Sequence, residues 1–367
     1  MSAADRGRAG ESETTVGWLV DRAGKVLKGS ANDIGWLQNA PGMPPVEDGT
    51  KRFDNLLFNI KNYQEHSLPK SFVYLLVPGL FSNLGPPNFD DTKTYFLKLG
   101  LECEVAKIDT QAGVLANASK IKELIEKLYY RSRKRVLILG HSKGGLDSAA
   151  ALSIYWNQLR DKVVGLVLAQ SPYAGNPIAS DILSQGLLKH VNLKKEVMEI
   201  IMSGILNGDL RAIEDLTYEK RREFLRSYPL PREIPVVSFH TETKINMSIL
   251  TKFYEVAKVE FSVTAPVGVR SFSKISVPWP LSSGLAMMAA LLDLRYSEKS
   301  DGLVTRKDAE APGSVVVRSR RNLDHGWIVL PCLNEDPKEA NNCQVIEALF
   351  TLLMEVAGRK GFLLPAY

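Results

Sequence analysis

Cysteine is scarce in this chain of 367 residues, and no segment is apolar for long. The three cysteines, Cys103, Cys332 and Cys343, are too few for a disulfide framework and do not have the spacing of a zinc site. We therefore expect free thiols in a reducing compartment. The longest apolar stretch, residues 283–293, is shorter than the roughly 20 residues that a membrane-spanning helix needs.

The first residues of the chain also lack features of targeting segments. They contain no apolar core of the kind found in signal peptides, and the acidic residues Asp5, Glu11 and Glu13 argue against an organellar transit peptide. These absences predict a soluble, cytoplasmic protein without a transmembrane segment. Peripheral contact with a membrane remains compatible with them.

Charge of one sign is not concentrated anywhere. The 46 basic residues are spread beside 41 acidic ones, and the basic clusters at 131–135 and 318–321 are short. Proteins that bind nucleic acids normally concentrate their positive charge more than this, so we expect solvated faces and no nucleic-acid partner. The composition, 45% hydrophobic and 24% charged, is that of a globular protein with a full core.

Apolar runs alternate with helical patterns in the first half of the chain. Residues 118–130 and 144–159 have apolar positions at helical spacing, and they lie between continuous apolar runs at 72–77, 101–108, 135–140 and 163–168. Continuous runs of this length are typical of strands that are buried on both faces of a parallel sheet. The alternation predicts an α/β protein with a doubly wound, mostly parallel sheet.

The later part of the chain predicts insertions into this sheet. Strand-like runs return at 234–239 and 314–317, and they leave a helical insert at about 178–230 and a second insert at about 241–295. Long inserts in such folds usually serve as lids or binding walls. We expect a disordered N-terminus at 1–15 and one domain from 16 to 367 that carries a helical cap.

The segment Gly140-His-Ser-Lys-Gly144 matches the G-x-S-x-G pattern. It lies between a predicted buried strand and a predicted helix, which is the context that a nucleophile elbow requires. In such an elbow Ser142 occupies a strained turn, and Gly140 and Gly144 relieve the crowding around it. We predict that Ser142 is a catalytic nucleophile.

A serine nucleophile needs a histidine base and an acid that orients the base. Of the five histidines, His325 follows the last predicted strand and precedes the final helix, where it can reach the carboxyl edge of the sheet; His240 is the alternative. Asp301 lies in a tight Ser-Asp-Gly turn upstream of His325 and gives the chain order Ser, Asp, His. The competing acids are Asp308, Glu310 and Asp324.

The tetrahedral intermediate of acyl transfer also needs backbone donors for its oxyanion. The amide of Lys143, directly after the nucleophile, is one predicted donor. The second is expected from the Pro78-Gly79-Leu80-Phe81 loop after the first apolar strand, and we assign it to Leu80.

These motifs together resemble those of the α/β-hydrolase superfamily. Over residues 70–330 the chain is similar to bacterial triacylglycerol lipases, including the Ser171-Pro-Tyr-Ala-Gly-Asn-Pro-Ile-Ala179 segment. As a whole it looks more like plant α/β-hydrolase proteins of undefined substrate, which share the His-Ser-Lys-Gly-Gly elbow and the Lys-Ser-Asp-Gly-Leu-Val-Thr turn. The resemblance implies an α/β-hydrolase fold and hydrolysis of esters.

The chain also departs from the lipases. Pro78 and Tyr173 stand where the lipases have histidines, which weakens the implication of a true lipid substrate. The lipases bind calcium through an aspartate two positions after the histidine, and Trp327 stands there in this chain, so we expect no metal and no cofactor.

The sequence therefore favours a serine hydrolase, an esterase or lipase that cleaves a small-molecule ester or lipid through an acyl-enzyme on Ser142. An acyltransferase with the same triad is one alternative, because the choice of acceptor depends on how the cap excludes water. A ligand-binding protein that keeps the fold without turnover is the other.

Overall fold

A computed structural model describes residues 29–80, 82, 89–183, 210–243, 296, 298–329 and 338–363. In these ranges seven strands form one sheet in the order β1-β7-β6-β5-β4-β2-β3, and all neighbouring strands are parallel. The strands are β1 (Glu47–Asp48), β2 (Phe72–Val77), β3 (Glu102–Val105), β4 (Arg135–His141), β5 (Val163–Ala169), β6 (Val236–Glu242) and β7 (Val315–Asn322).

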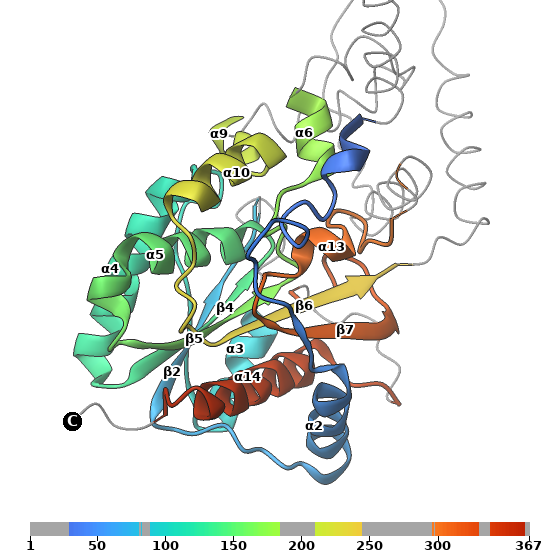
Figure 1. The fold of residues 1–367 in the computed structure, drawn as a ribbon. Helices are drawn as coiled ribbons and strands as arrows, with labels where there is room; N and C mark the ends of the chain where they lie inside the picture. Colours follow the sequence, from blue (N-terminus) through green and yellow to red (C-terminus); the bar gives the residue numbers. More distant parts are fainter. Residues whose placement is uncertain are drawn as a thin grey trace, which may run out of the picture.

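Helices cover both faces of this sheet (Figure 1). α4 and α5 pack on one face, and α2, α3 and α14 pack on the other. The helices are η1 (Gly29–Asp33), α2 (Thr50–Tyr63), α3 (Asp90–Lys98), α4 (Val114–Ser132), α5 (Lys143–Leu159), α6 (Pro177–Leu183), α9 (Leu210–Glu214), α10 (Tyr218–Ser227), α13 (Arg306–Ala309) and α14 (Asn342–Arg359). The doubly wound parallel sheet predicted from the sequence is confirmed.

The apolar runs of the sequence form the centre of the sheet. In β2, Tyr74 and Leu76 face the core beneath α14, whereas Val73, Leu75 and Val77 face the core beneath α4 and α5. All five side chains are fully buried. Burying one such side chain stabilises the fold by roughly 1.5–3 kcal/mol, so these two cores fix the position of the strands that carry the site.

The strand order has a switch point between β2 and β4. From β2 the chain first adds β3 on one side, then returns to β4 on the other side and continues outward through β5, β6 and β7. Loops that leave the carboxyl ends of parallel strands at a switch point diverge, and the crevice between them is where such sheets bind ligands. The segment that follows β4 begins with Ser142.

Three of the described helices lie in the predicted cap region. α6, α9 and α10 come between β5 and β6, which are neighbours in the sheet, so the sheet does not need them for its continuity. Residues 184–209 of this insert, residues 244–295 of the second insert and the N-terminal residues 1–15 lie outside the described residues. The cap and the disordered N-terminus therefore stay predictions.

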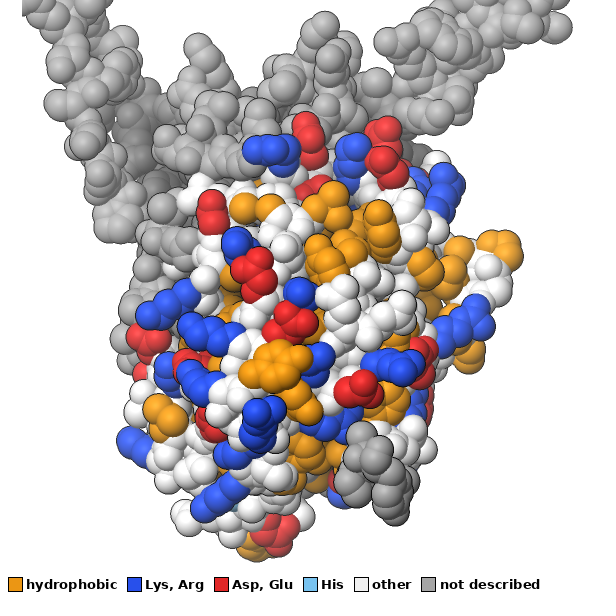
Figure 2. Space-filling model, turned by 90° about the vertical axis from the view of Figure 1, so that its left-hand side faces the viewer, with side chains coloured by type: hydrophobic (Ala, Val, Ile, Leu, Met, Phe, Trp, Pro, Cys, Tyr) orange, Lys and Arg blue, Asp and Glu red, His pale blue; other side chains and the backbone are white. Residues whose placement is uncertain are grey.

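Several residues of the two basic clusters form ion pairs with acidic neighbours. Arg131 and Lys134 pair with Glu102 at 3.2 and 3.3 Å, and Arg318 pairs with Glu310 at 2.8 Å. On the face that carries α4, basic and acidic side chains are interspersed (Figure 2). Among the helices that the structure describes, none has the length and apolarity needed to cross a bilayer.

Candidate active site

Ser142 connects β4 directly to α5 through a strained backbone turn. Its φ of 53° and ψ of −128° are unusual for a residue with a side chain, and such conformations cost about 1–3 kcal/mol. Hydrogen bonds on both sides hold the turn: Ser142 N donates to Ala169 O at 2.9 Å, and Gly145 N donates to Ser142 O at 3.0 Å. The predicted elbow conformation is confirmed.

The glycines around Ser142 are required by close backbone contacts. A Cβ on Gly144 would lie 2.4 Å from Pro78 O, and one on Gly140 would lie 2.5 Å from the Cα of Gly145. Backbone atoms cannot move aside for a methyl group without displacing a strand or a helix. The sequence prediction that these glycines relieve crowding at the elbow is therefore confirmed.

Asp301 and His325 lie together, although 24 residues separate them. Asp301 Oδ2 is 2.8 Å from His325 Nδ1, and the amide of His325 donates to Asp301 O at 2.9 Å. The other carboxylate oxygen, Oδ1, accepts from the amides of Leu303 and Val304 at 3.0 and 2.8 Å. A carboxylate held in this way keeps the imidazole proton on Nδ1 and leaves Nε2 as the basic nitrogen.

His141, the residue before the nucleophile, connects the elbow to this Asp–His pair by its contacts with His325. The rings of His141 and His325 have centroids 4.8 Å apart, and His141 Nε2 lies 2.9 Å from His325 O. Among the residues that the structure describes, no hydrogen bond joins Ser142 Oγ to His325. In apo structures catalytic hydrogen bonds are often long and become short only when substrate binds.

His141 is a neutral donor at this contact. Because the His325 carbonyl can only accept, the proton of His141 is on Nε2. Burial, together with the neighbouring His325, lowers the pKa of His141 to about 3. His141 therefore holds the His325 loop without adding a charge beside it.

Gln170, directly after β5, holds the same loop from another side. It is fully buried and has a φ of 50°. Its Nε2 donates to Asp324 O at 3.0 Å and to Thr241 Oγ1 at 2.7 Å. The carboxyl ends of β4, β5 and β6 thus all contribute to the placement of His325.

The predicted oxyanion donors belong to the residue after Ser142 and to the turn after β2. Lys143 is the first residue of α5, where a backbone N–H has no acceptor within the helix. Leu80 is half-buried in the turn after β2, and a Cβ on the preceding Gly79 would lie 2.9 Å from the Cβ of Ser142. The Gly79 backbone therefore passes directly beside the nucleophile.

The Lys143 side chain points away from this chemistry. Its Nζ lies 2.8 and 2.9 Å from the two carboxylate oxygens of Asp147, and both side chains are almost fully buried. Asn117 Nδ2 on α4 donates to the same carboxylate at 2.9 Å. Burial raises the pKa of Asp147 to about 6, against the lowering effect of Lys143. This buried network links the first turn of α5 to α4.

The competing residues of the sequence analysis are engaged elsewhere. His240 lies 3.1 Å from Glu310, which also accepts from Arg318. Asp308 accepts from Tyr218 OH at 2.6 Å, and the carboxylate of Asp324 accepts from the Gly326 amide at 2.9 Å. None of these acids contacts the imidazole of His325 in the described part of the chain.

The base of the predicted cap is fastened to the loop that carries Asp301. The bond from Tyr218 on α10 to Asp308 is one link, and Asn176 Nδ2 donates to Leu303 O at 2.7 Å as a second. The buried Arg221 of α10 donates through Nε to Tyr173 O at 3.0 Å. A displacement of α10 would therefore be transmitted to the acid loop.

Comparisons with known proteins agree with this architecture. A family model described as a PGAP1-like alpha/beta domain matches residues 104–216, which include the elbow. The metagenomic carboxyl esterase MGS0156 has a similar structure, with a TM-score of 0.56 and 19% identity over 84% of this chain and 93% of that one. The mature lipase BlEst2 of Bacillus licheniformis has a TM-score of 0.50 and 16% identity over 80% of this chain and 94% of its own.

A search of curated protein sequences finds no significant relative. At these identities the structural similarity establishes the fold. The chain is an α/β-hydrolase-fold protein, distantly similar in structure to bacterial esterases and lipases.

Proposed function

We propose that this protein is a serine hydrolase that cleaves carboxylic esters through an acyl-enzyme on Ser142. The observation that carries the proposal is the juxtaposition of two independent features. Ser142, in a strained strand-to-helix turn, directly follows His141, whose ring lies 4.8 Å from the ring of His325. His325 forms a buried pair with Asp301 that leaves its Nε2 as a base. The elbow, the acid and the base come from three loops at one edge of the sheet.

In the proposed reaction, His325 Nε2 takes the proton of Ser142 as Oγ attacks the ester carbonyl. The amides of Lys143 and Leu80 donate to the oxyanion of the tetrahedral intermediate in this scheme, because backbone donors need little reorganisation as the charge develops. His325 then gives the proton to the leaving alcohol, and the acyl group stays on Ser142. Water, activated by the same imidazole, releases the acid and regenerates the hydroxyl.

Asp301 has the orienting role in this scheme. Two backbone amides fix one of its oxygens, so the other oxygen is directed at His325 Nδ1 and stabilises the imidazolium that forms during attack. His141 and Gln170 are positioning residues, because they act on the backbone of the His325 loop.

Purified protein assayed with p-nitrophenyl esters of graded chain length tests the proposal. We expect turnover that is lost in S142A and retained in S132A, a matched control at the end of α4 where Ser132 Oγ donates to Leu128 O and accepts from the Lys134 amide. Release of p-nitrophenol at equal rates by wild type and S142A would refute the assignment of Ser142. Adding an alcohol and analysing the products separates water from an alcohol as the acyl acceptor.

A further inference from the structure

A cavity lies on the face of the sheet that carries α5. Its volume is about 400 Å³, within the range of roughly 300–1,000 Å³ that is usual for ligand pockets. The segment before β1 forms one wall, the chain from α10 to β6 forms a second, and the turn before β7 closes it. None of the residues proposed for catalysis lines it.

The walls of this cavity are apolar and rigid. Proline fixes the backbone φ, and five of the lining residues are prolines: Pro44, Pro45, Pro229, Pro231 and Pro312. The wall before β1 is also tied to the turn before β7, because Gly313 N donates to Pro44 O at 3.2 Å. A cavity that is already formed saves the ligand the cost of ordering its walls.

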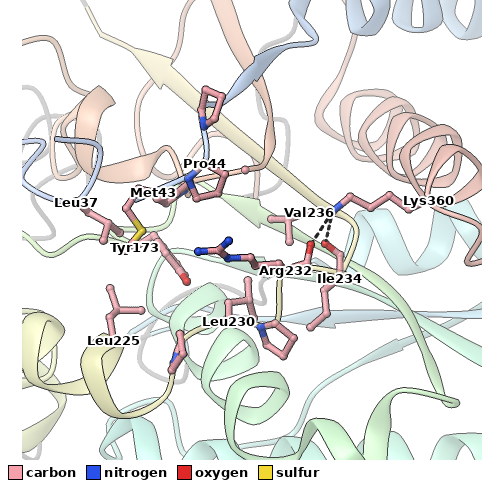
Figure 3. Close-up of a pocket in the computed structure, with 15 residues that line it drawn as sticks. Leu37, Met43, Pro44, Tyr173, Leu225, Leu230, Arg232, Ile234, Val236 and Lys360 are labelled. Atoms are coloured by element: carbon pink, nitrogen blue, oxygen red, sulfur yellow. Dashed lines mark hydrogen bonds between the residues drawn. The ribbon is translucent and has the colours of Figure 1, made fainter. Parts of the chain in front are cut away.

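The charge inside the cavity is of one sign. Arg232 and Lys360 line it, and among the described lining residues none is acidic. The Arg232 side chain extends into the middle of the cavity, between Tyr173 and Val236 (Figure 3). In the described part of the chain the Arg232 guanidinium forms no ion pair, and its one hydrogen bond, to Gly42 O, is long at 3.5 Å.

Lys360 holds the segment on which Arg232 is placed. Its Nζ donates to Arg232 O and to Ile234 O, both at 3.1 Å, as the dashed lines of Figure 3 show. Burial lowers the pKa of Lys360, and the nearby carboxylate of Glu233, which does not line the cavity, acts in the opposite direction. Among the described residues, Arg232 is thus the cation of the lining that has no carboxylate partner.

We propose that this cavity binds a medium-chain fatty acid as its anion. The acyl chain lies along Leu37, Leu225 and Leu230, and the carboxylate meets the guanidinium of Arg232, whose planar fork matches a carboxylate in a two-point contact. An apolar tail alone leaves Arg232 without a partner, and an anion without a tail leaves the apolar walls exposed to water. The two features together select an amphiphile with a carboxylate.

Isothermal titration calorimetry of the S142A protein with decanoate tests this site without turnover, so its outcome does not depend on the proposed hydrolysis. Decanoate should bind, whereas decyltrimethylammonium, with the same tail and opposite charge, and acetate, with no tail, should not. R232Q should weaken the binding of decanoate about 5-fold, the effect of an ion pair worth about 1 kcal/mol.

Two further variants locate the site. M43W, which places a larger side chain at the 43%-exposed rim of the cavity, should weaken binding more than R232Q does. R226Q on α10, an exposed arginine that does not line the cavity, should bind decanoate as S142A does. If M43W does not fold, the exposed R232Q variant still decides the question. Absence of decanoate binding, or equal affinities for R232Q and R226Q, would overturn the proposal.

Discussion

Replacing Asp301 with asparagine exchanges one carboxylate oxygen of the proposed triad for an amide nitrogen. The side-chain oxygen of the introduced asparagine should take the place of Oδ1, because the amides of Leu303 and Val304 require an acceptor there. The NH₂ group then faces His325 Nδ1 at the position that now lies 2.8 Å away. Since both would be donors, the imidazole proton moves to Nε2 and the base facing Ser142 is lost.

The expected loss in kcat/KM is about 10⁴-fold, or about 5.4 kcal/mol of transition-state stabilisation, as for other triads in which the acid can no longer set the tautomer. Hydrolysis of a p-nitrophenyl ester measures it, and circular dichroism checks the fold. D324N is the matched control, because Asp324 is the neighbour of His325 but its carboxylate accepts from the Gly326 amide. Activity of D301N within 10-fold of wild type, or a larger loss in D324N, would refute the assignment.

Three further predictions concern the supports of the site. K143M should lower the free energy of unfolding by about 3–5 kcal/mol, because Asp147 is left buried without its partner, and the double variant K143M/D147L should regain much of this. H141F should lower kcat about 10-fold with little change in KM, because the ring is kept but the donor to the His325 carbonyl is lost, and H141Q should restore part of the rate. Burial raises the pKa of Asp308 from 3.8 to about 6, so the folded protein holds this proton more tightly than the unfolded chain does. Wild type should therefore lose roughly 3 kcal/mol of stability relative to D308N in total as the pH rises from about 3 to about 7, about 2 kcal/mol of it between pH 4 and pH 6, with no further change above pH 7.

Unfolding and kinetic measurements test these predictions. Denaturant unfolding at pH 4.5 and 7.5 follows the stability of the Lys143 and Asp308 variants. A K143M protein as stable as wild type, or a difference between wild type and D308N that does not vary with pH, would contradict the buried-charge arguments. For His141, an H141F variant with unchanged kcat would show that its contact with His325 does not position the base.

The central strands could be predicted from the sequence because their burial is two-sided. β2, β4 and β5 appear as continuous apolar runs, since helices cover both of their faces. The expected strand at 101–108 is shorter in the structure, where β3 ends at Val105 after pairing with β2. β3 is an edge strand, and one further hydrogen bond to β2, from Ala106 N to Leu76 O, follows its last residue.

Residues 16–66 hold scattered apolar positions among Gly and Pro without a clear period, so the sequence does not predict α2. α2 buries Phe53, Leu56 and Ile60 against α14, but charged and polar residues lie between them. Its hydrophobic pattern is therefore weaker than the continuous apolar runs of the sheet strands. β1 has only two residues and was not recognisable from sequence. Its pairing with β7 depends on tertiary packing.

At the site, the features that a local motif specifies could be predicted from the sequence, whereas the long-range contacts could not. The elbow could be recognised because five consecutive residues and their flanks specify it. The roles of His141 and Gln170 could not, because each depends on a loop more than 150 residues away in the chain. The Lys143–Asp147 pair had a usable signal, since opposite charges four residues apart in a predicted helix face each other.

The central claim is that Ser142 is an activated nucleophile, and covalent labelling with a fluorophosphonate probe tests it most directly. Intact-mass measurement should show one adduct per chain, peptide mapping should place it on Ser142, and S142A should not be labelled. D301N should react far more slowly than wild type, because the probe reports the same base-assisted attack. A folded wild-type protein that does not react, or an adduct that persists in S142A, would contradict the account.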